Sequence, residues 1–338
     1  MSEPIVVWGA GAIGGTIAAH WARAGEEVLL VDLVAEHVEA CRSSGLKIEG
    51  PVDEFQVVIP ALLPEEVTGQ FSRIVLAVKA HHTEEAIKSV APHLAADGFV
   101  VSTQNGLNEL VISEVIGKER TVGAFINFGA DWIEPGRVMF GNRGAVVVGE
   151  LDGISVERTR DLHRLMQIFE PDAVLTDNIW GYLWGKLGYS AMLNATALTN
   201  NSMADNFADP RLESLWISLA REVIGLAHKR GIIPIGFDGF NPASFAPDSG
   251  AEAAKQSIAD LAEFNRHSAK THSGVWRDLA IRKRKTEVDA KFPLLIQLAE
   301  EDGLEVPLLR CLTDLIHEVE EGRRELGDAN LDILLERM

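Results

Sequence analysis

The chain has few cysteines. Only Cys41 and Cys311 occur among its 338 residues, and they lie far apart in the sequence. No cluster of cysteines could therefore hold zinc, and we expect both side chains to be free, buried thiols. Free thiols are typical of proteins in a reducing compartment, so the cysteine content favours the cytoplasm.

Long apolar runs are also missing. No stretch approaches the roughly 20 consecutive apolar residues that a helix needs to span a bilayer. The sequence enters a strand-like run at Ile5, almost at its start, without the pattern of a signal peptide. We therefore expect a cytoplasmic protein that does not have a membrane as its partner.

Positive charge is scarce. Lys and Arg together number 31 against 50 Asp and Glu, which gives a formal net charge of −19. This balance argues against nucleic acid or an anionic membrane surface as a partner, and an acidic substrate would need local cations to attract it. One basic cluster, residues 282–285, stands out. Its simplest interpretation is a solvated helix face among acidic neighbours.

The length and the 46% apolar content predict about two domains with a sizeable core. In the first half, strand-like and helical runs alternate, which is typical of an α/β domain with a parallel sheet. From Asp177 onward only helical periodicity is found. We therefore expect a parallel-sheet α/β domain at 1–177 and an all-helical domain at 178–338.

Hydrophobic period and turn residues predict the individual elements. The predicted strands are 5–9, 27–32, 55–60, 73–78, 99–102, 122–126, 137–140, 145–149 and 173–176. The strands at 122–126, 137–140 and 145–149 could pair antiparallel. The predicted helices are 16–24, 35–43, 83–91, 108–116, 155–169, 178–200, 210–230, 251–269, 275–302, 306–322 and a short one near the C-terminus. Residues 231–250, rich in Pro, Gly and Phe, form the main irregular connection.

The first strand leads into a glycine-rich loop, Gly9-Ala10-Gly11-Ala12-Ile13-Gly14, which fits the pattern G-x-G-x-x-G. Gly9 would permit a tight turn, Gly11 would let the backbone approach a pyrophosphate, and Gly14 would let the next helix pack close to the strand. The free N–H groups at the positive end of that helix would then hold phosphates. The pattern predicts that these six residues bind a cofactor.

The second strand ends on a carboxylate. Asp32 lies about 20 residues after the glycines, where it can accept hydrogen bonds from the ribose of adenosine. The whole pattern predicts a Rossmann-type dinucleotide-binding domain, and a glycine-rich turn without a ligand is the alternative. A 2′-phosphate would meet a like charge at Asp32, and neither Leu33 nor Val34 offers a cation, which favours NADH over NADPH. Arg42 in the following helix could offset that charge if it swung in, but it lies too far along the chain.

Two further strands end on polar residues. Lys79 follows a continuously apolar run, and Asn105 lies between Gln104 and Gly106 after the next predicted strand. Ligands of open parallel sheets bind outside the carboxyl ends of the strands. We therefore expect Lys79 to contact a phosphate or the substrate, and Asn105 to meet nicotinamide and substrate. The alternatives are a surface lysine and an asparagine that forms a turn before Gly106.

One helix of the second half carries a polar line. Lys186, Ser190 and Asn194 are spaced i, i+4 and i+8, which puts an ammonium, a hydroxyl and an amide on one face. Mostly apolar or small neighbours indicate that this face lines a cleft between domains, and a solvent-facing polar stripe is the alternative. Further on, Glu287 lies among cations, which by itself is typical of an ion-pairing helix residue.

Taken together, five motifs resemble the ketopantoate reductase (2-dehydropantoate 2-reductase) family. In family order they are Gly9-Ala10-Gly11-Ala12-Ile13-Gly14, Val78-Lys79-Ala80, Gln104-Asn105-Gly106, Trp184-Gly185-Lys186 with Asn194, and Thr286-Glu287-Val288-Asp289. The resemblance implies a Rossmann domain followed by an all-helical domain, with the active site between them. It implies reduction of the C2 ketone of a branched 2-oxo acid, 2-dehydropantoate to pantoate, with hydride from NAD(P)H.

The resemblance also implies roles for individual residues. Lys186 matches the catalytic lysine, which donates the proton, and Glu287 matches a glutamate that helps to bind ligand in the closed site. We expect these two to be the catalytic residues. Asn105 matches an asparagine that touches cofactor and substrate, and Lys79 matches a lysine near the cofactor.

The match to the family's substrate residues is looser. Asn194 matches a substrate-binding asparagine, whereas Ser190 stands where the family usually has another asparagine, one turn after the lysine. We expect Ser190 to bind substrate as well. Ser273 lies close to the family's serine for the substrate carboxylate, but the spacing from Asp278 to Glu287 is one residue longer than in the family.

Other functions stay open at this point. One is an NAD-dependent D-2-hydroxyacid dehydrogenase of the same fold, and another is a dinucleotide sensor without catalysis. The family usually takes NADPH through an arginine at the position of Asp32, so the residue and the family habit point to different cofactors. The expected partner is a small 2-oxo acid, and the chain could also assemble as a homodimer.

Overall fold

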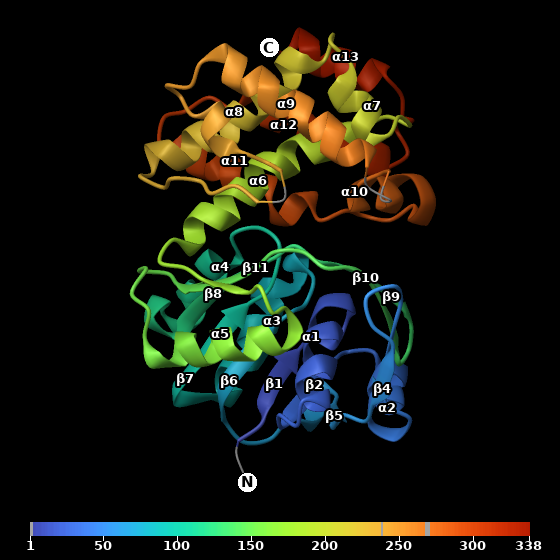
Figure 1. Ribbon diagram of the computed structural model, residues 1–338, viewed down its shortest axis with the longest axis vertical. Coiled ribbons are helices and arrows are strands. Elements are labelled where there is room, and N and C mark those ends of the chain that lie inside the picture. The colour runs from blue at the N-terminus through green and yellow to red at the C-terminus, as the bar shows by residue number, and fades with distance from the viewer. Residues whose placement is uncertain (1–2, 238, 268–270) are drawn as a thin grey trace. The chain divides into compact units, whose positions relative to one another are not determined.

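A computed structural model describes residues 3–237, 239–267 and 271–338 (Figure 1). The chain divides into two compact units, Met1–Ile179 and Trp180–Met338. The boundary expected from the sequence, after residue 177, lies two residues before this division.

An eight-stranded sheet forms the centre of the first unit. In spatial order its strands are β12 (Val174–Leu175), β11 (Val146–Glu150), β8 (Thr121–Ile126), β7 (Leu94–Ser102), β6 (Phe71–Leu76), β1 (Ile5–Trp8), β2 (Val28–Val31) and β5 (Ala61–Leu62). Neighbouring strands run parallel except for β8 and β11, which pair antiparallel. All four residues of β1 are buried, as its continuous apolar sequence predicts. The expected α/β class with a mainly parallel sheet is confirmed.

Helices cover both faces of this sheet. They are α1 (Ala12–Arg23), α2 (Ala35–Ser43), α3 (Thr83–Val90), α4 (Asn108–Ile116) and α5 (Glu157–Phe169). Successive residues of a strand point to opposite faces, so the sheet takes part in two apolar cores. Val75 and Val101 belong to the core that includes residues of α1 and α5, whereas Ile74 and Val100 belong to the core that includes residues of α3 and α4.

A second sheet of four strands packs on α1. Its order is β4 (Phe55–Val57), β3 (Leu46–Glu49), β10 (Arg137–Asn142) and β9 (Gly129–Glu134), and α1 contacts every one of them. The strands β3 and β9 were not predicted, and the strand predicted at 55–60 ends three residues earlier, at Val57. β3 is too short for its alternation to stand out, and β9 is an edge strand whose last three residues are exposed.

The first helix starts earlier than expected. Sequence analysis placed its start at Thr16, whereas α1 begins at Ala12 and includes Gly14. Glycine is a poor helix former, which is why the sequence favours the later start. Tertiary packing overrides this preference, because a Cβ at Gly14 would collide with the carbonyl oxygen of Gly9.

The second unit is helical, as expected. Its helices are α6 (Ile179–Thr196, whose first residue belongs to the first unit), α7 (Met203–Ala208), α8 (Glu213–Lys229), α9 (Ala251–Arg266), α10 (Gly274–Trp276), α11 (Phe292–Glu301), α12 (Pro307–Glu320) and α13 (Ala329–Glu336). Within the described part of this unit, the strand-like pairing is one isolated bridge, Phe237 to Phe240. The helix α7 was not expected, and the predicted helix end at 269 lies outside the described residues.

The prediction of one continuous helix at 275–302 is wrong. After α10 the chain forms a π-helical turn at Arg277–Arg282, and it leaves the helix at Lys283, whose φ is 49°. A short 3₁₀ segment, Val288–Ala290, then precedes α11. The residues 283–287 between these segments are four charged side chains and one threonine, so this stretch has no apolar face to bury against a core.

A carboxyl group is buried beneath the first unit's surface. Glu109, in the first turn of α4, is fully buried, and neither of its carboxyl oxygens has a hydrogen-bond partner. The loss of hydration on burial raises the pKa of Glu109 to about 8. The Ser102 hydroxyl and the backbone of Glu109 itself lower the pKa, but by less than burial raises it. The oxygen of Ser102 is also buried without a hydrogen-bond partner.

We expect Glu109 to make the first unit less stable as pH rises. The folded protein keeps the proton up to pH about 8, while the unfolded chain loses it near the ordinary value of 4.5. The contribution of Glu109 to the free energy of unfolding is therefore complete below pH 4.5 and is lost as the pH rises through 8. This loss is on the order of a few kcal/mol. Urea unfolding of Glu109→Gln between pH 5 and pH 8.5 should show a flatter dependence than the wild type shows. Glu114→Gln, an exposed position on the same helix, is the matched control, and equal slopes in all three proteins would contradict the expectation.

Candidate functional site

The carboxyl ends of four strands meet at one edge of the large sheet. Trp8 of β1 is in register with Val31 of β2 and with Leu76 of β6, and Leu76 is in register with Ser102 of β7. The loops that follow these residues therefore leave the sheet side by side. They carry the residues that the sequence predicts for a cofactor site: Gly9–Gly14, Asp32, Lys79 and Asn105.

The glycine-rich loop has the conformation that its glycines require. Gly9 has a φ of +102°, and a Cβ on it would lie 2.6 Å from the backbone nitrogen of Val78. A Cβ on Gly14 would overlap the carbonyl oxygen of Gly9, whereas a Cβ on Gly11 would meet nothing within 4 Å. The tight turn at Gly9 and the close packing at Gly14 are confirmed. The space at Gly11 leaves the loop backbone open to a ligand.

The N-terminus of α1 offers free backbone donors at this open loop. Gly11 is the N-cap residue, and in the described chain no side chain caps this helix end. The N–H groups of Ala12, Ile13 and Gly14 have no acceptor within the helix, because the first turn lies too near its start. Together with the positive end of the helix dipole, these donors fit the diphosphate of a dinucleotide.

The backbone anchors the Asp32 carboxylate at the end of β2. Its Oδ2 accepts a hydrogen bond from the N–H of Ala10 at 2.8 Å, and its Oδ1 accepts one from the N–H of Val34 at 3.0 Å. The N–H of Ala10 is therefore already used and is not among the donors left for a phosphate. Leu33, next to the carboxylate, is 74% exposed and presents an apolar surface there.

Lys79 and Asn105 occupy the neighbouring loops. Lys79 directly precedes a 3₁₀ turn at Ala80–His82, three residues past the buried end of β6 at Leu76. Asn105 precedes Gly106, whose φ of +103° confirms that a turn forms here. The two residues thus stand where strands β6 and β7 end, as the sequence predicts.

Three buried polar residues connect these two loops, and of the three only Gln104 belongs to a motif noted in the sequence. Gln104 donates from Nε2 to the carbonyl oxygen of Val78 at 2.9 Å and to Oγ1 of Thr83 at 2.7 Å. The side chains of Thr83 and Asn108 are 2.7 Å apart, and Nδ2 of Asn108 donates to the carbonyl oxygen of Asn105 at 2.6 Å. These bonds fix the loops relative to each other. Thr83 lies among exposed residues, so its burial leaves no signal in the sequence.

In the second unit, α6 carries the predicted polar line of Lys186, Ser190 and Asn194. Asn194 is 1% exposed, and its Nδ2 donates to the carbonyl oxygen of Ser190 at 2.7 Å and to the Ser190 hydroxyl at 3.1 Å. Its Oδ1 is buried and has no hydrogen-bond partner. An unpartnered buried acceptor is costly, so this atom is suited to receive a donor from a ligand.

Ser273 has a structural role in the same unit. It is 4% exposed, and its hydroxyl oxygen accepts a hydrogen bond from the N–H of Trp276 at 3.2 Å, which caps α10. The basic cluster at 282–285 follows, and all four of its residues are exposed. Its interpretation as a helix face is wrong, because the helix ends within it. Asp278 holds two of its cations, Arg282 at 3.1 Å and Arg284 at 2.9 Å.

Glu287 lies at the start of the 3₁₀ segment, so the expectation of an ordinary helix residue is wrong. The residues beside it are anchored to α12. The N–H of Thr286 donates to Oε1 of Glu320 at 2.7 Å, and Asp289 contacts Nε2 of His317 at 2.6 Å. These two anchors define the position of the Glu287 backbone within the second unit.

Other kinds of site find little support in the described residues. Both cysteines are free there, but only Cys41 is buried, and burial raises the pKa of its thiol to about 12. Cys311 is half-buried, so the expectation of two buried thiols is wrong for it. Over the described ranges, no three His, Cys, Asp or Glu side chains gather in a way that could hold a metal ion. No helix in those ranges has the length and apolarity to cross a bilayer.

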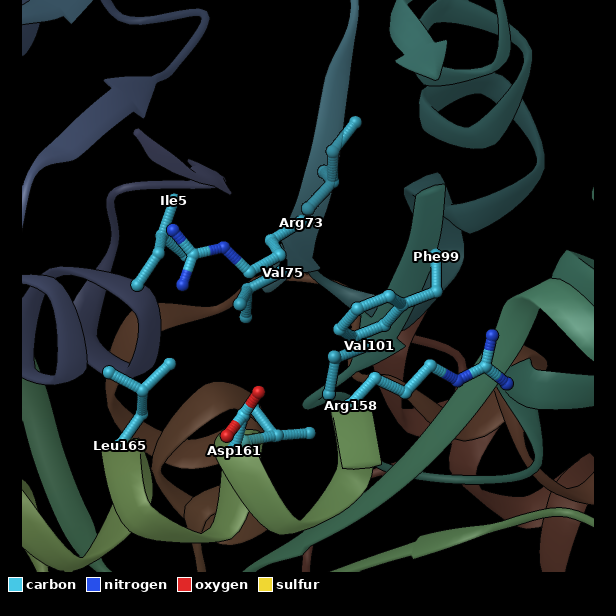
Figure 2. A pocket seen from close by; sticks show the side chains of 10 residues that line it. Ile5, Arg73, Val75, Phe99, Val101, Arg158, Asp161 and Leu165 are labelled. Carbon is cyan, nitrogen blue, oxygen red and sulfur yellow. The ribbon is translucent and has the colours of Figure 1, made fainter. Parts of the chain in front are cut away.

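A small cavity of about 70 Å³ lies between the large sheet and α5 (Figure 2). Most of its lining is apolar, and it also includes three charged side chains, Arg73, Arg158 and Asp161. None of the residues predicted for the site lines it. This cavity is therefore distinct from the strand ends that carry the glycine-rich loop.

Two family models match the chain. The model described as "Ketopantoate reductase PanE/ApbA" matches residues 5–153, and "Ketopantoate reductase PanE/ApbA C terminal" matches residues 178–320. A 2-dehydropantoate 2-reductase of Pyrococcus abyssi is 28% identical over 331 residues, which cover 95% of this chain and 99% of the relative.

Two solved structures share the fold. A PanE/ApbA family ketopantoate reductase from Ralstonia eutropha JMP134 has a TM-score of 0.78 and 24% identity, and the match covers 95% of this chain and 99% of the other. A D-mandelate dehydrogenase, solved with NADH and anilino(oxo)acetate, has a TM-score of 0.79 and 22% identity, with coverage of 94% and 99%. At these identities the likeness concerns the fold alone.

The family models account for both units and follow the order that the sequence motifs predict. Enzymes of this kind are oxidoreductases that combine a nicotinamide dinucleotide with a small-molecule substrate. The chain belongs to the ketopantoate reductase family.

Proposed function

We propose that the protein reduces the C2 ketone of a branched 2-oxo acid to a hydroxyl group, with 2-dehydropantoate as the first candidate substrate. The observation that carries the proposal is the polar face of α6, where Asn194 keeps a buried, unpartnered oxygen two turns from Lys186. Relatives named 2-dehydropantoate 2-reductase, which match nearly the whole chain, support the choice of substrate.

Lys186 is proposed to be the general acid. When bound, NAD(P)H supplies the hydride for the carbonyl carbon. Negative charge then develops on the carbonyl oxygen, and the ammonium group of Lys186 would stabilise it by a hydrogen bond. The same group would next transfer a proton from Nζ to that oxygen, which completes the hydroxyl.

The first unit is proposed to hold the cofactor. Its diphosphate would lie on the backbone donors of Gly11–Gly14, and Asp32 would accept hydrogen bonds from the adenosine ribose. Gly9 and Ala10 would shape this loop. Lys79 and Asn105, at the ends of the neighbouring strands, would contact the cofactor, and Asn105 would also contact the substrate.

The second unit is proposed to hold the substrate. The unpartnered oxygen of Asn194 could accept a hydrogen bond from a hydroxyl of pantoate, and the neighbouring Ser190 hydroxyl could add another. Ser273 uses its hydroxyl oxygen as an acceptor for Trp276, so its O–H is left to donate to a carboxylate. Glu287 is proposed to help bind the ligands and so to complete the catalytic set.

A second candidate is a D-2-hydroxyacid dehydrogenase that takes other branched or aromatic 2-oxo acids. Two observations favour it: Ser190 replaces the usual asparagine of the family, and a D-mandelate dehydrogenase has the same fold. Both candidates share the reaction and the proposed lysine, so they differ only in the side chain of the substrate. A sensor without catalysis would bind the dinucleotide but turn nothing over.

The first prediction concerns turnover. Purified protein should oxidise NADH or NADPH in the presence of 2-dehydropantoate and more slowly with other 2-oxo acids, measured by absorbance at the nicotinamide band. Lys186→Ala should lower kcat by roughly 10²–10⁴-fold, the range for a positioned proton donor, with cofactor affinity little changed. Lys229→Ala, an exposed lysine of α8, is the control. Near-normal kcat in Lys186→Ala would refute the role, and dinucleotide binding without turnover of any 2-oxo acid would favour the sensor.

The second prediction concerns Asn194. Asn194→Ala should raise KM for the 2-oxo acid and lower kcat together, because the substrate loses both a contact and its alignment. Asn206→Ala removes an equally buried asparagine of the same unit, whose amide bonds only protein groups, and should lower stability without changing KM. Unchanged saturation kinetics in Asn194→Ala would assign Asn194 to helix structure alone.

The third prediction concerns the cofactor. NADH should be preferred over NADPH by about tenfold to hundredfold in kcat/KM, because a 2′-phosphate would approach the Asp32 carboxylate. In the structure the Arg42 guanidinium pairs with Glu39 at 2.7 Å and with Glu66 at 3.7 Å instead of with Asp32. Asp32→Asn should bring the ratio of the two kcat/KM values towards one. A wild type that prefers NADPH would contradict the assignment and would point to a cation from another loop.

A further inference from the structure

His37 of α2 connects three segments of the first unit. Its ring is 1% exposed, and Nε2 lies 2.8 Å from the carbonyl oxygen of Ala10 in the glycine-rich loop. Its Nδ1 accepts a hydrogen bond from the N–H of Gly136 at 2.9 Å. Gly136 lies in the turn between β9 and β10, so one imidazole links that turn, α2 and the loop.

The two partners define where the ring carries its proton. The backbone N–H of Gly136 can only donate, so Nδ1 must be an acceptor without a proton. The carbonyl of Ala10 can only accept, so Nε2 must carry the hydrogen and donate it. In this arrangement His37 carries its ring hydrogen on Nε2. The Sγ atom of Cys41 lies 3.7 Å from Nε2, and the rings of His37 and Trp132 pack edge-on with their centroids 6.1 Å apart.

Ala10 is held on both sides. Its N–H donates to Asp32, and its carbonyl accepts from His37. The described chain has no cis peptide bonds, so the carbonyl of Ala10 and the N–H of Gly11 point in opposite directions. Because His37 binds that carbonyl from the protein interior, the N–H of Gly11 is turned away from the interior.

We propose that His37 is a positioning residue of the dinucleotide site. It sets the orientation of the Gly11 N–H and thereby the affinity of the loop for the diphosphate of the cofactor. The inference deepens the proposed function and rests on it, because it takes the loop to bind a dinucleotide. His37 acts only through the backbone of Ala10 and is not a catalytic residue.

Two substitutions separate the two hydrogen bonds of the ring. In His37→Gln the side-chain amide reaches the position of Nε2 and can still donate to Ala10, but the bond from Gly136 is lost. In His37→Asn the side-chain oxygen stays near the position of Nδ1 and can still accept from Gly136, but the bond to Ala10 is lost. Both variants should have a lower Tm than the wild type, since each loses one buried hydrogen bond.

Cofactor binding should distinguish these variants. In titrations followed by NADH fluorescence, His37→Asn should raise the Kd about fivefold to tenfold, and His37→Gln should stay within about twofold of the wild type. KM for NADH should follow the same order, while kcat at saturating NADH should be unchanged. His163→Asn is the matched control, because it removes the bond from Nε2 of His163 in α5 to the carbonyl oxygen of Ala173, 2.7 Å away and outside the loop. It should lower Tm without changing the Kd.

Two results would overturn the inference: a wild-type Kd in His37→Asn, or equal weakening in both His37 variants in proportion to their loss of Tm. The titration also separates this inference from the proposed function. A wild type that binds NADH but reduces no 2-oxo acid would refute the proposed reaction. The Kd values of the two His37 variants would then still decide whether His37 positions the loop. A wild type that binds neither NADH nor NADPH would refute both.

Discussion

The first unit depends on the close contact between α1 and the end of β1. Gly14 lies against the carbonyl oxygen of Gly9, at a distance that no side chain would permit. This contact places the N-terminus of α1 at the edge where β1, β2, β6 and β7 end. The first N–H groups of the helix have no acceptor within the helix, and an anion is bound favourably at such a position. A single steric constraint thus creates both the tight loop and the row of helix N–H groups that could hold an anion.

Buried polar groups then hold the loops around this contact. Asp32 and His37 bind the two polar atoms of Ala10, and Gln104 connects the loop after β6 with the loop after β7. These bonds involve backbone atoms, so they fix the course of the chain rather than only a side-chain rotamer. In α6 of the second unit, by contrast, the Asn194 oxygen remains unpartnered. In the first unit the candidate site therefore consists mainly of backbone groups in fixed positions, whereas in the second unit it consists of side-chain groups.

Missing apolar faces and contacts between distant residues explain why some features were predicted wrongly or not at all. The helix expected at 275–302 breaks at Lys283, because its charged stretch has no apolar face that a core could hold. The four-stranded sheet joins β3 to β10, which lies some ninety residues further along the chain, and β3 is too short to show a strong period by itself. The bond between His37 and Gly136 spans 99 residues, so no local pattern indicates it.

The sequence by itself determined the α/β and helical classes of the two units, the glycine-rich loop, and the positions of Asp32, Lys79 and Asn105 after strands. It also determined the shared helix face of Lys186, Ser190 and Asn194. These features depend on spacing within a few residues. The periods of helices and strands determine from such spacing on which side of the element each side chain lies. Only the tertiary structure decided that Ser273 caps a helix, that Ala10 has no free donor and that His37 holds the loop. Each of these depends on which backbone groups other contacts leave within hydrogen-bond reach.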